Sequence, residues 1–346
     1  MQSAVFVVPG SLDTRTGGYI YDRRIVDGLR QQGWGVEVVE IDDSFPYPTR
    51  AALAGASRAL GRIRAGATVL IDSLALGALP DLIVQEASRL QIVALVHLPL
   101  AANVAIDPDA AARFEAGERR ALRAVERVIV TGKAARSLLA RYDLDPDRIA
   151  VVEPGTDRAP LARGSAGGGV NLLCVAGLHP GKGHEMLLAA LAGVGGGGWR
   201  LACAGSLTRD ARAAAAVEAA VARLGLCGRV SLLGDLDETA LAAAYDRADL
   251  FVLATRQETY GMAVAEALAR GLPVVSTRTG AIPELVGEDA GMIVPVDDTA
   301  ALACALGRAI GESGYRARLA AGARRVRDRL PTWDDASASL AEVLTR

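Results

Sequence analysis

The chain has 346 residues, 51% of them hydrophobic and 23% charged, which is the balance of a globular protein long enough for two domains. Its formal net charge of −2 excludes a strongly basic, nucleic-acid-binding protein. The four cysteines, Cys174, Cys203, Cys227 and Cys304, stand far apart without a CxxC spacing, which argues against zinc and disulfides and for a reducing cytoplasm.

Short apolar runs alternate with amphipathic helical patterns along the first half of the chain. The runs lack in-and-out alternation, as expected for a parallel sheet covered on both faces. The predicted strands are 4–8, 36–41, 68–71, 92–97, 127–130 and 149–152, and the predicted helices are 21–32, 81–89 and 111–126. The chain starts in the first strand without the basic segment of a signal peptide, and no apolar run reaches the ~18 residues of a membrane span. We therefore expect a cytoplasmic protein without a transmembrane segment.

A stretch rich in glycine, proline and arginine, residues 153–169, interrupts this pattern and is typical of a linker. A second series follows, with strands 171–176, 199–204, 230–233, 250–253, 273–276 and 291–294, and helices 185–191, 209–224, 238–247 and 259–270. A last helical segment follows Pro331. Two such series predict an α/β fold of two Rossmann-like domains, residues 1–160 and 161–330, facing each other across a cleft.

The first candidate site is Thr16-Gly17-Gly18-Tyr19, between the first predicted strand and the first helix. Glycines let the backbone approach a ligand, and the free N–H groups of a helix start attract an anion, so the segment suits a phosphate. It lacks the third glycine of the dinucleotide fingerprint GxGxxG. A tight turn that needs glycine dihedral angles is the open alternative.

The second candidate is Gly177-Leu-His-Pro-Gly-Lys-Gly183, after the first strand of the second domain. It is not a Walker A loop, because Ala176 and Gly183 occupy positions that need glycine and serine or threonine. Lys182, one of only two lysines in the chain, is a candidate point-charge partner for a diphosphate. A solvated surface lysine is the alternative.

The third candidate is a pair of carboxylates eight positions apart, Glu258 before a predicted helix and Glu266 inside it. A carboxylate that follows a strand of an open α/β sheet lies at the edge where ligands bind. Glu266 stands in an apolar helical run and needs a partner, and the two hydroxyls of a ribose would supply donors. The alternative is a helix-capping acid and an ordinary surface glutamate.

Residues 255–275, which include this pair, resemble the E-x7-E signature of the retaining GT-B glycosyltransferases of family 4, the glycosyl transferases group 1. The similarity continues through residues 279–286, is strong over 171–300 and is weaker in the first half. The glycine pair, His97 at the end of a predicted strand, and the Pro-Gly-Lys-Gly loop follow in the family's order. Trp333 is similar to the C-terminal helical segment, here residues 331–346, which in the family crosses back onto the first domain.

The resemblance implies a role for each matching residue. Gly17 and Gly18 would donate N–H groups to the donor diphosphate, His97 would face the donor sugar, and Lys182 would neutralise the leaving diphosphate. Glu258 would contact sugar hydroxyls with the backbone N–H groups of Tyr260, Gly261 and Met262, Glu266 would hold the ribose, and Leu233 and Gly234 would lie near the base.

One position departs from the family pattern. Gly177 stands where the family commonly has an arginine, so half of the cationic clamp on the diphosphate is missing. Arg15, Arg256 and His179 are the candidates to replace it.

The activity implied by the resemblance is transfer of a sugar, with retained configuration, from a UDP- or GDP-linked donor to a hydroxyl of a small-molecule, lipid or glycan acceptor, without a metal or other cofactor. A lipid acceptor would allow peripheral membrane contact. The Asp-x-Asp pairs at Asp143 and Asp235 are interpreted as helix caps, and the arginines of residues 113–148 as a solvated face, since acids are interleaved with them. The alternatives are a GT-B epimerase acting on a nucleotide-sugar and a non-catalytic protein that binds a nucleotide or sugar phosphate.

Overall fold

The computed structural model describes residues 2–104, 106–195 and 198–345. The chain forms two units, the first from Met1–Gly155 with Pro331–Arg346 and the second from Thr156–Leu330. The observed boundary between the units, after Gly155, lies before the predicted one, after residue 160, because part of the predicted linker is hydrogen-bonded to the second unit. The N–H of Ala162 donates to the carbonyl of Arg270, and those of Arg163 and Gly164 donate to the carbonyl of Asp246.

The first unit contains a six-stranded parallel sheet in the order β2-β1-β3-β4-β5-β6. Its strands are β1 Ser3–Pro9, β2 Gly35–Ile41, β3 Thr68–Asp72, β4 Gln91–Val96, β5 Arg127–Val130 and β6 Ile149–Val151. Its helices are α1 Gly17–Gln31, α2 Arg50–Arg62, α3 Ser73–Leu76, α4 Pro80–Glu86, α5 Pro108–Ala124, α6 Lys133–Leu138 and α14 Trp333–Thr345, with short 3-10 turns at Leu100–Ala102, Leu139–Tyr142 and Pro146–Arg148.

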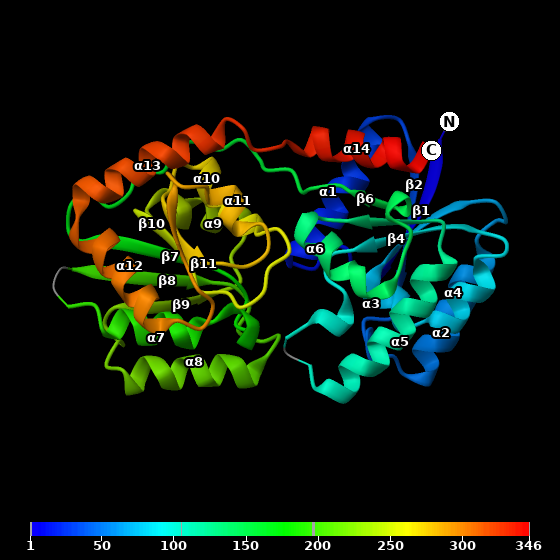
Figure 1. The fold of residues 1–346 in the computed structure, drawn as a ribbon, viewed down its shortest axis with the longest axis horizontal. Helices are drawn as coiled ribbons and strands as arrows, with labels where there is room; N and C mark the ends of the chain where they lie inside the picture. The colour runs from blue at the N-terminus through cyan, green and yellow to red at the C-terminus, as the bar shows by residue number, and fades with distance from the viewer. Residues whose placement is uncertain (1, 105, 196–197, 346) are drawn as a thin grey trace. The chain divides into compact units, whose positions relative to one another are not determined.

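The C-terminal helix α14 packs on α1 (Figure 1). The side-chain amide of Gln32 donates to the hydroxyl of Ser337 over 3.0 Å, and the ring of Trp333 lies edge-on to that of Tyr21 with centroids 6.0 Å apart. The last helix therefore returns to the first unit, as predicted.

The second unit contains another six-stranded parallel sheet, in the order β12-β11-β10-β7-β8-β9. Its strands are β7 Val170–Val175, β8 Trp199–Ala204, β9 Val230–Gly234, β10 Leu250–Leu253, β11 Val274–Thr277 and β12 Gly291–Val294. Its helices are α7 His184–Ala192, α8 Ala211–Arg223, α9 Glu238–Asp246, α10 Met262–Ala269, α11 Ile282–Val286, α12 Thr299–Gly311 and α13 Ser313–Arg327, with a 3-10 turn at Pro180–Lys182. In Figure 1, α7 and α8 lie on one face of this sheet and α10, α11 and α13 on the other.

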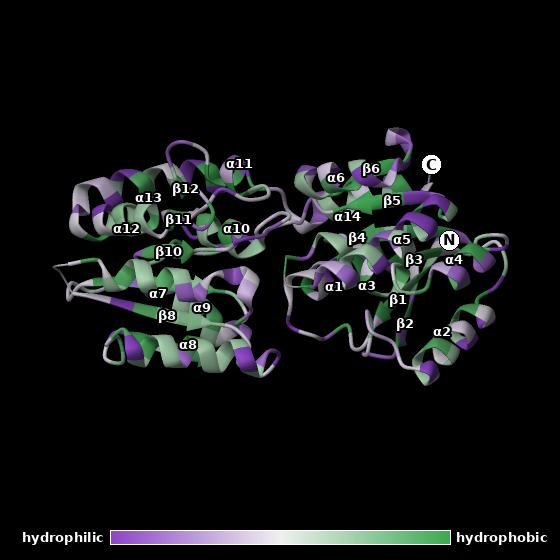
Figure 2. Ribbon diagram, turned by 60° about the horizontal axis from the view of Figure 1, so that its bottom comes forward, coloured by the Kyte–Doolittle hydropathy of each residue, from purple (hydrophilic) through white to green (hydrophobic). Residues whose placement is uncertain are grey.

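The strands of both sheets are built mainly from apolar residues, and the helices combine apolar and polar residues (Figure 2). In β1, for example, Phe6, Val7 and Val8 are at most 1% exposed. Burying such aliphatic side chains on both faces of two sheets is the main favourable contribution to folding. The α/β class and the two Rossmann-like units predicted from the sequence are confirmed, and the predicted cleft stays a prediction.

Helices α1 and α10 show why some predicted helices begin at other residues in the structure. Helix α1 starts at Gly17 instead of residue 21, because the hydroxyl of Thr16 caps it by accepting from the N–H of Tyr19. Helix α10 starts at Met262 instead of residue 259, because Gly261, with φ of 99°, forms its N-cap in the left-handed region. Helices α2, α12 and α13 lie outside the predicted elements, in segments rich in alanine and arginine whose apolar pattern is weak.

Candidate active site

Each sheet has a point where consecutive connections run to opposite sides of a strand. In the first unit the chain goes from β1 to β2 on one side and then to β3 on the other, and in the second unit β10 lies beside β7, on the side away from β8. Ligands of open α/β sheets bind at the carboxyl ends of the strands at such switch points. The predicted residues after β1 and β4, and those after β7 and β10, lie at these ends.

The start of α1 follows β1 at the first of these points. Thr16 accounts for two N–H groups, since its hydroxyl accepts from Tyr19 and its carbonyl accepts from Ile20. The N–H groups of Gly17 and Gly18, at the first two helical positions, have no partner within the described part of the chain. They are therefore available to an anion, as the sequence predicts.

His97, the first residue after β4, lies between two carboxylates. Its Nε2 is 2.9 Å from Oδ1 of Asp22 on α1 and 3.5 Å from Oδ2 of Asp72 at the end of β3. Both carboxylates are buried, whereas the imidazole is 19% exposed. Sequence reasoning missed both aspartates.

The three groups change one another's protonation. Burial, together with the negative charge of Asp22, raises the pKa of Asp72 to about 7. Burial opposes a charge on His97, but Asp22 and then Asp72 outweigh it and raise the pKa of the imidazole above 6.5. The cluster therefore holds protons near neutral pH that separate side chains would release.

His97 and Asp72 also line a cavity of about 140 Å³ in the first unit. The start of α1 contributes Thr16, Gly18 and Tyr19, and the segment after β4 contributes Leu98, Pro99, Leu100 and Asn103. Gly18 lies directly against the imidazole, because a Cβ added there would be 3.3 Å from Cδ2 of His97. Gly18 and His97, which are 79 positions apart in the chain, thus line one site.

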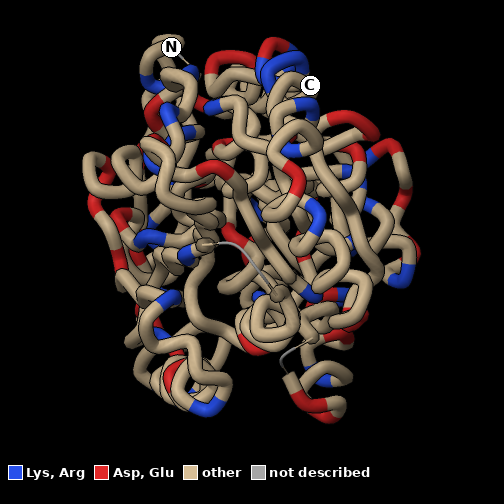
Figure 3. The backbone as a smooth tube through the Cα atoms, turned by 90° about the vertical axis from the view of Figure 1, so that its left-hand side faces the viewer, with Lys and Arg blue, Asp and Glu red and all other residues tan. Residues whose placement is uncertain are grey.

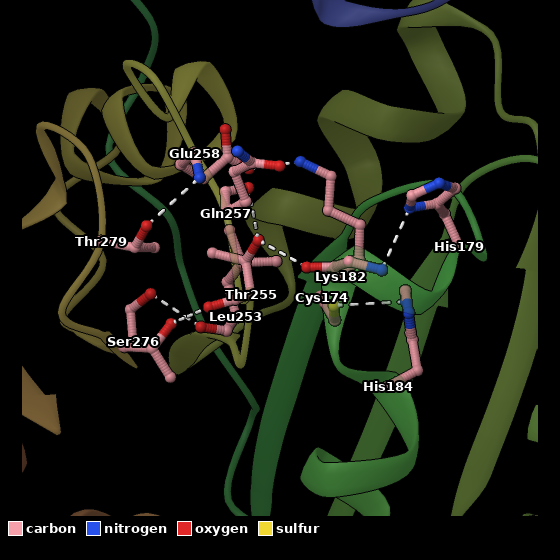
Figure 4. Close-up of polar contacts among 12 residues, drawn as sticks. Cys174, His179, Lys182, His184, Leu253, Thr255, Gln257, Glu258, Ser276 and Thr279 are labelled. Atoms are coloured by element: carbon pink, nitrogen blue, oxygen red, sulfur yellow. Dashed lines mark hydrogen bonds and ion pairs between the residues drawn. The ribbon is translucent and has the colours of Figure 1, made fainter. Parts of the chain in front are cut away.

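In the second unit the structure brings together Lys182, after β7, and Glu258, after β10 (Figure 4). The ammonium Nζ lies 2.5 Å from Oε1 of Glu258. The lysine side chain is 31% exposed and the glutamate 16%, so the pair is partly shielded from water. The sequence predicts roles for both residues but not their contact.

Backbone and hydroxyl contacts between the two loops hold this pair in place. The buried hydroxyl of Thr255 donates to the carbonyls of Gly181 and Gln257, over 3.1 and 3.0 Å, and the N–H of Arg256 donates to the carbonyl of Gly181 over 2.7 Å. Gly183 is needed here, since with φ of 66° a Cβ would lie 2.0 Å from the carbonyl oxygen of Ala254. The two loops therefore form one rigid structure.

The start of α10 lies next to Glu258. The N–H of Glu258 donates to the hydroxyl of Thr279 over 3.4 Å, and no side chain caps α10. The first intrahelical bonds come from Val264 and Ala265 to the carbonyl of Gly261, so the N–H of Met262 stands before them at the helix start. Tyr260 is buried.

The sequence analysis assumed that the Glu266 carboxylate has no partner within the protein, but it has one. The hydroxyl of Tyr245 on α9 donates to its Oε2 over 2.9 Å. Tyr245 is buried, and burial and then the charge of Glu266 raise the pKa of its phenol. A tyrosine hydroxyl uses one of the carboxylate's acceptor positions, and the others can still accept from a ribose.

The three proposed substitutes for the missing arginine differ in the structure. The guanidinium of Arg256 is engaged by Asp297, with Nε 2.7 Å from Oδ1. His179 accepts the N–H of Gly181 at Nδ1, and burial together with the charge of Lys182 lowers its pKa, so it is neutral at pH 7. Arg15 is exposed in the loop before α1.

Leu233 and Gly234 end β9 at the same edge of the sheet. The side chain of Leu233 is 40% exposed, which is unusual for a leucine in this unit, and Gly234 has φ of 69°. An exposed apolar side chain at the ligand edge is consistent with a base nearby.

Two clusters contain residues of the kinds that bind metals. One is Asp22, Asp72 and His97, whose ligand atoms already contact one another. The other is Cys174, Cys203 and His184, which are all buried, although the two cysteines stand 29 positions apart in the sequence. Cys174 and Cys203 are register partners on neighbouring parallel strands, so distance along the chain was misleading.

The two Asp-x-Asp pairs cap turns and helices, as interpreted. Asp237 accepts the N–H of Ala240 at the start of α9, and Asp145 accepts that of Asp147. Four arginines of residues 113–148, Arg119, Arg120, Arg123 and Arg141, are paired with acids, for example Arg119 with Glu115 over 2.9 Å, whereas Arg148 donates to the backbone carbonyl of Leu122. Figure 3 shows basic and acidic positions interspersed along the chain.

Residues 169–312 match the family model Glycosyl transferases group 1. This segment lies within the second unit and contains both Lys182 and Glu258. The second unit is therefore similar to this glycosyl transferase family. The resemblance inferred from the sequence is thereby confirmed.

The chain is also similar to curated members of the group. The D-inositol 3-phosphate glycosyltransferase of Xylanimonas cellulosilytica is 32% identical over 246 residues, which are 66% of this chain and 58% of that protein. The enzyme of the same name from Salinispora tropica is 30% identical over 252 residues, 66% of this chain and 52% of that protein. The chain thus spans less than two thirds of these relatives.

Solved glycosyltransferase structures show the GT-B fold of the whole chain. Sucrose-phosphate synthase from Thermosynechococcus elongatus aligns with a TM-score of 0.85 and 21% identity over 100% of this chain and 98% of that one. HepE of Anabaena, solved with UDP and glucose, aligns with a TM-score of 0.79 and 17% identity over the full length of both. No helix within the described ranges is long and apolar enough to cross a membrane.

Proposed function

We propose that this protein is a retaining glycosyltransferase that moves a sugar from a nucleoside-diphosphate sugar to an acceptor hydroxyl without a metal ion. The observation that carries the proposal is the Lys182–Glu258 pair at the switch point of the second unit, inside the segment that matches the family. The names of the sequence relatives support the reaction class, and the UDP and glucose bound to HepE support a nucleotide-sugar donor.

The residues at this edge suit the departure of a nucleoside diphosphate. Negative charge builds up on the leaving phosphate while the sugar becomes cationic, and a fixed ammonium such as Lys182 stabilises that charge without reorganisation. The backbone N–H groups at the start of α1 are also donors that suit an anionic group. The Glu258 carboxylate would accept hydrogen bonds from sugar hydroxyls, and Glu266 from the ribose.

Retention is proposed because no protein base is required if the leaving phosphate itself takes the proton of the acceptor hydroxyl on the same face of the sugar. The acceptor is a small molecule, lipid or glycan, and the names of the sequence relatives favour a small, hydroxyl-rich molecule. We place the reaction in the cytoplasm, where a nucleotide-sugar donor would be supplied.

A binding screen followed by product analysis tests the proposal. UDP, GDP, ADP, TDP and CMP are compared by thermal shift, where a ligand at 100 times its Kd stabilises by about 2.7 kcal/mol and raises Tm by several degrees. Sugar conjugates of the best nucleotide are then incubated with acceptors, and the anomeric configuration of the product is read by NMR.

Lys182→Met is the matching variant. Loss of one preorganised contact to a developing charge costs about 10²–10³ in rate, so kcat should fall at least a hundredfold. A fall of less than threefold would contradict the role of Lys182. Binding without any nucleotide release would support a non-catalytic binding protein, and an altered sugar without acceptor would support an epimerase.

A further inference from the structure

The ring of His97 is covered by neighbouring residues at Cδ2 and Nε2 but not at Nδ1. Gly18 lies against Cδ2, the ring of Tyr21 meets the imidazole edge-on with centroids 5.3 Å apart, and Nε2 faces the two aspartates. Nδ1 has no hydrogen-bond partner among the described residues and is not among the side-chain nitrogens sealed from solvent. Since His97 lines the cavity of the first unit, its open side is the one that carries Nδ1.

The charges around the ring determine which nitrogen carries the proton. An ionised Asp22 can only accept, and its Oδ1 is 2.9 Å from Nε2, so Nε2 carries the hydrogen and donates it to Asp22. In neutral His97 the remaining nitrogen, Nδ1, is then an acceptor. Two tyrosines are also nearby: Tyr21 meets the ring edge-on and donates its hydroxyl to the carbonyl of Val152, and Tyr19 lines the same cavity and donates its hydroxyl to the carbonyl of Pro9.

This arrangement is costly for the fold. Asp22 is fully buried, and among the residues that the structure describes its second oxygen, Oδ2, has no hydrogen-bond partner. An unsatisfied buried carboxylate oxygen opposes folding, and apolar side chains of similar volume would fill the same space at no such cost. A destabilising polar cluster that opens into a cavity is typical of a functional site.

We propose that Asp22 and Asp72 are positioning residues for His97, fixing its Nε2–H so that Nδ1 accepts a hydrogen bond from a sugar hydroxyl bound in the cavity of the first unit. This inference rests on the proposed function for the identity of the ligand as a sugar. Asp22 sets the tautomer through its direct hydrogen bond. Asp72 is farther away, and once it is ionised its negative charge favours the imidazolium form when Nδ1 takes up a proton.

The first experiment is NMR of the ring nitrogens in the unligated protein, so its result does not depend on the donor or on turnover. The chain has three histidines, His97, His179 and His184, and single glutamine variants assign their signals. We expect His97 to be the Nε2–H tautomer and to titrate above 6.5. His179 is the internal reference, because its Nδ1 accepts the N–H of Gly181 and its pKa is lowered, so it titrates below His97.

The second experiment compares Asp22→Asn with Asp27→Asn, a matched control on an exposed part of the same helix. We expect Asp22→Asn to lower the pKa of His97 by one pH unit or more and Asp27→Asn to leave it unchanged. If Asp22→Asn does not fold, Asp72→Asn serves instead and should cause a smaller shift in the same direction.

Measurements of kcat distinguish a positioning role of Asp22 from a purely structural one. In Asp22→Asn, kcat should fall about tenfold or more while the affinity for free nucleoside diphosphate stays within twofold, and the pH profile of kcat should follow the new pKa of His97. An Nδ1–H tautomer, an unshifted pKa in both aspartate variants, or loss of the His97 signals on adding stoichiometric Mn²⁺ would overturn the proposal. A correct tautomer in a protein that turns over no sugar nucleotide would leave this geometry intact and refute the proposed function instead.

Discussion

Replacing Asp72 by asparagine should change how the stability of the first unit depends on pH. The pKa of Asp72 is about 7 in the folded protein, through burial and the charge of Asp22, against an ordinary value of 3.8. Between these values the folded state keeps a proton that the unfolded chain releases. The stabilisation is therefore complete at pH values below 3.8 and is lost as pH rises through 7.

The size of the effect follows from the same interval. About three pH units correspond to about 4 kcal/mol if Asp72 titrates alone. Asp22 and His97 titrate together with it, so we expect about 1–3 kcal/mol. His97 acts in the same direction, because its pKa is raised and its contribution is lost as pH rises above 6.5.

Urea unfolding at pH 5 and pH 8 measures this difference. Asparagine keeps an oxygen that can accept the N–H of Leu74 over 2.6 Å, so the cap of α3 is preserved. In a Trp199→Phe background the fluorescence comes from Trp34 and Trp333, both in the first unit. We expect the wild type to lose about 1–3 kcal/mol relative to Asp72→Asn between pH 5 and pH 8.

Asp81→Asn is the control, because it also removes one carboxylate of the first unit but from a side chain that is 81% exposed. Its pH dependence should match that of the wild type. If the curves of the wild type and Asp72→Asn are parallel from pH 5 to pH 8, Asp72 is ionised throughout and our description of the cluster is wrong.

Three further substitutions test the ligand edges. Glu258→Gln should free Lys182 and tighten the binding of free nucleoside diphosphate about two- to fivefold by calorimetry, since a partly exposed ion pair contributes up to about 1 kcal/mol. Turnover should fall. Unchanged or weaker binding would mean that Glu258 does not compete with the ligand for Lys182. Tyr245→Phe leaves Glu266 without its tyrosine donor and should reduce discrimination between ribo- and 2′-deoxynucleotides, measured as a ratio of Kd values; an unchanged ratio would separate Glu266 from the ribose. Gly18→Ala should lower kcat at least tenfold with a small change in Tm, because its Cβ would lie 3.3 Å from the imidazole and displace it; full activity would show that the ring tolerates the shift.

The strands could be predicted closely because most of them are apolar runs in a sheet covered on both faces. The predicted segment 127–130, for example, coincides with β5. Helix starts were less predictable, since α10 depends on the left-handed conformation of Gly261, which no hydrophobic pattern encodes. Alanine-rich helices such as α12 bury small side chains and give a weak apolar signal.

The candidate site was predictable as residues but not as contacts. Lys182 and Glu258 are 76 positions apart, and only the strand order of the second sheet brings them together. Asp72 had a signal, since it ends an apolar strand at the ligand edge. Asp22 had one too, because it shares the buried face of α1 with Ile25 and Leu29, where an acid is unexpected.

The missing arginine gives the Lys182–Glu258 pair a further consequence. With Gly177 in that position, Arg256 engaged by Asp297 and His179 neutral, Lys182 is the main cation at the switch point of the second unit. A diphosphate that binds there must take Lys182 from Glu258. That exchange frees a carboxylate, which needs new donors, and the hydroxyls of the attached sugar would supply them. A free nucleoside diphosphate lacks those hydroxyls, so the intact donor should gain more from the exchange than the product does.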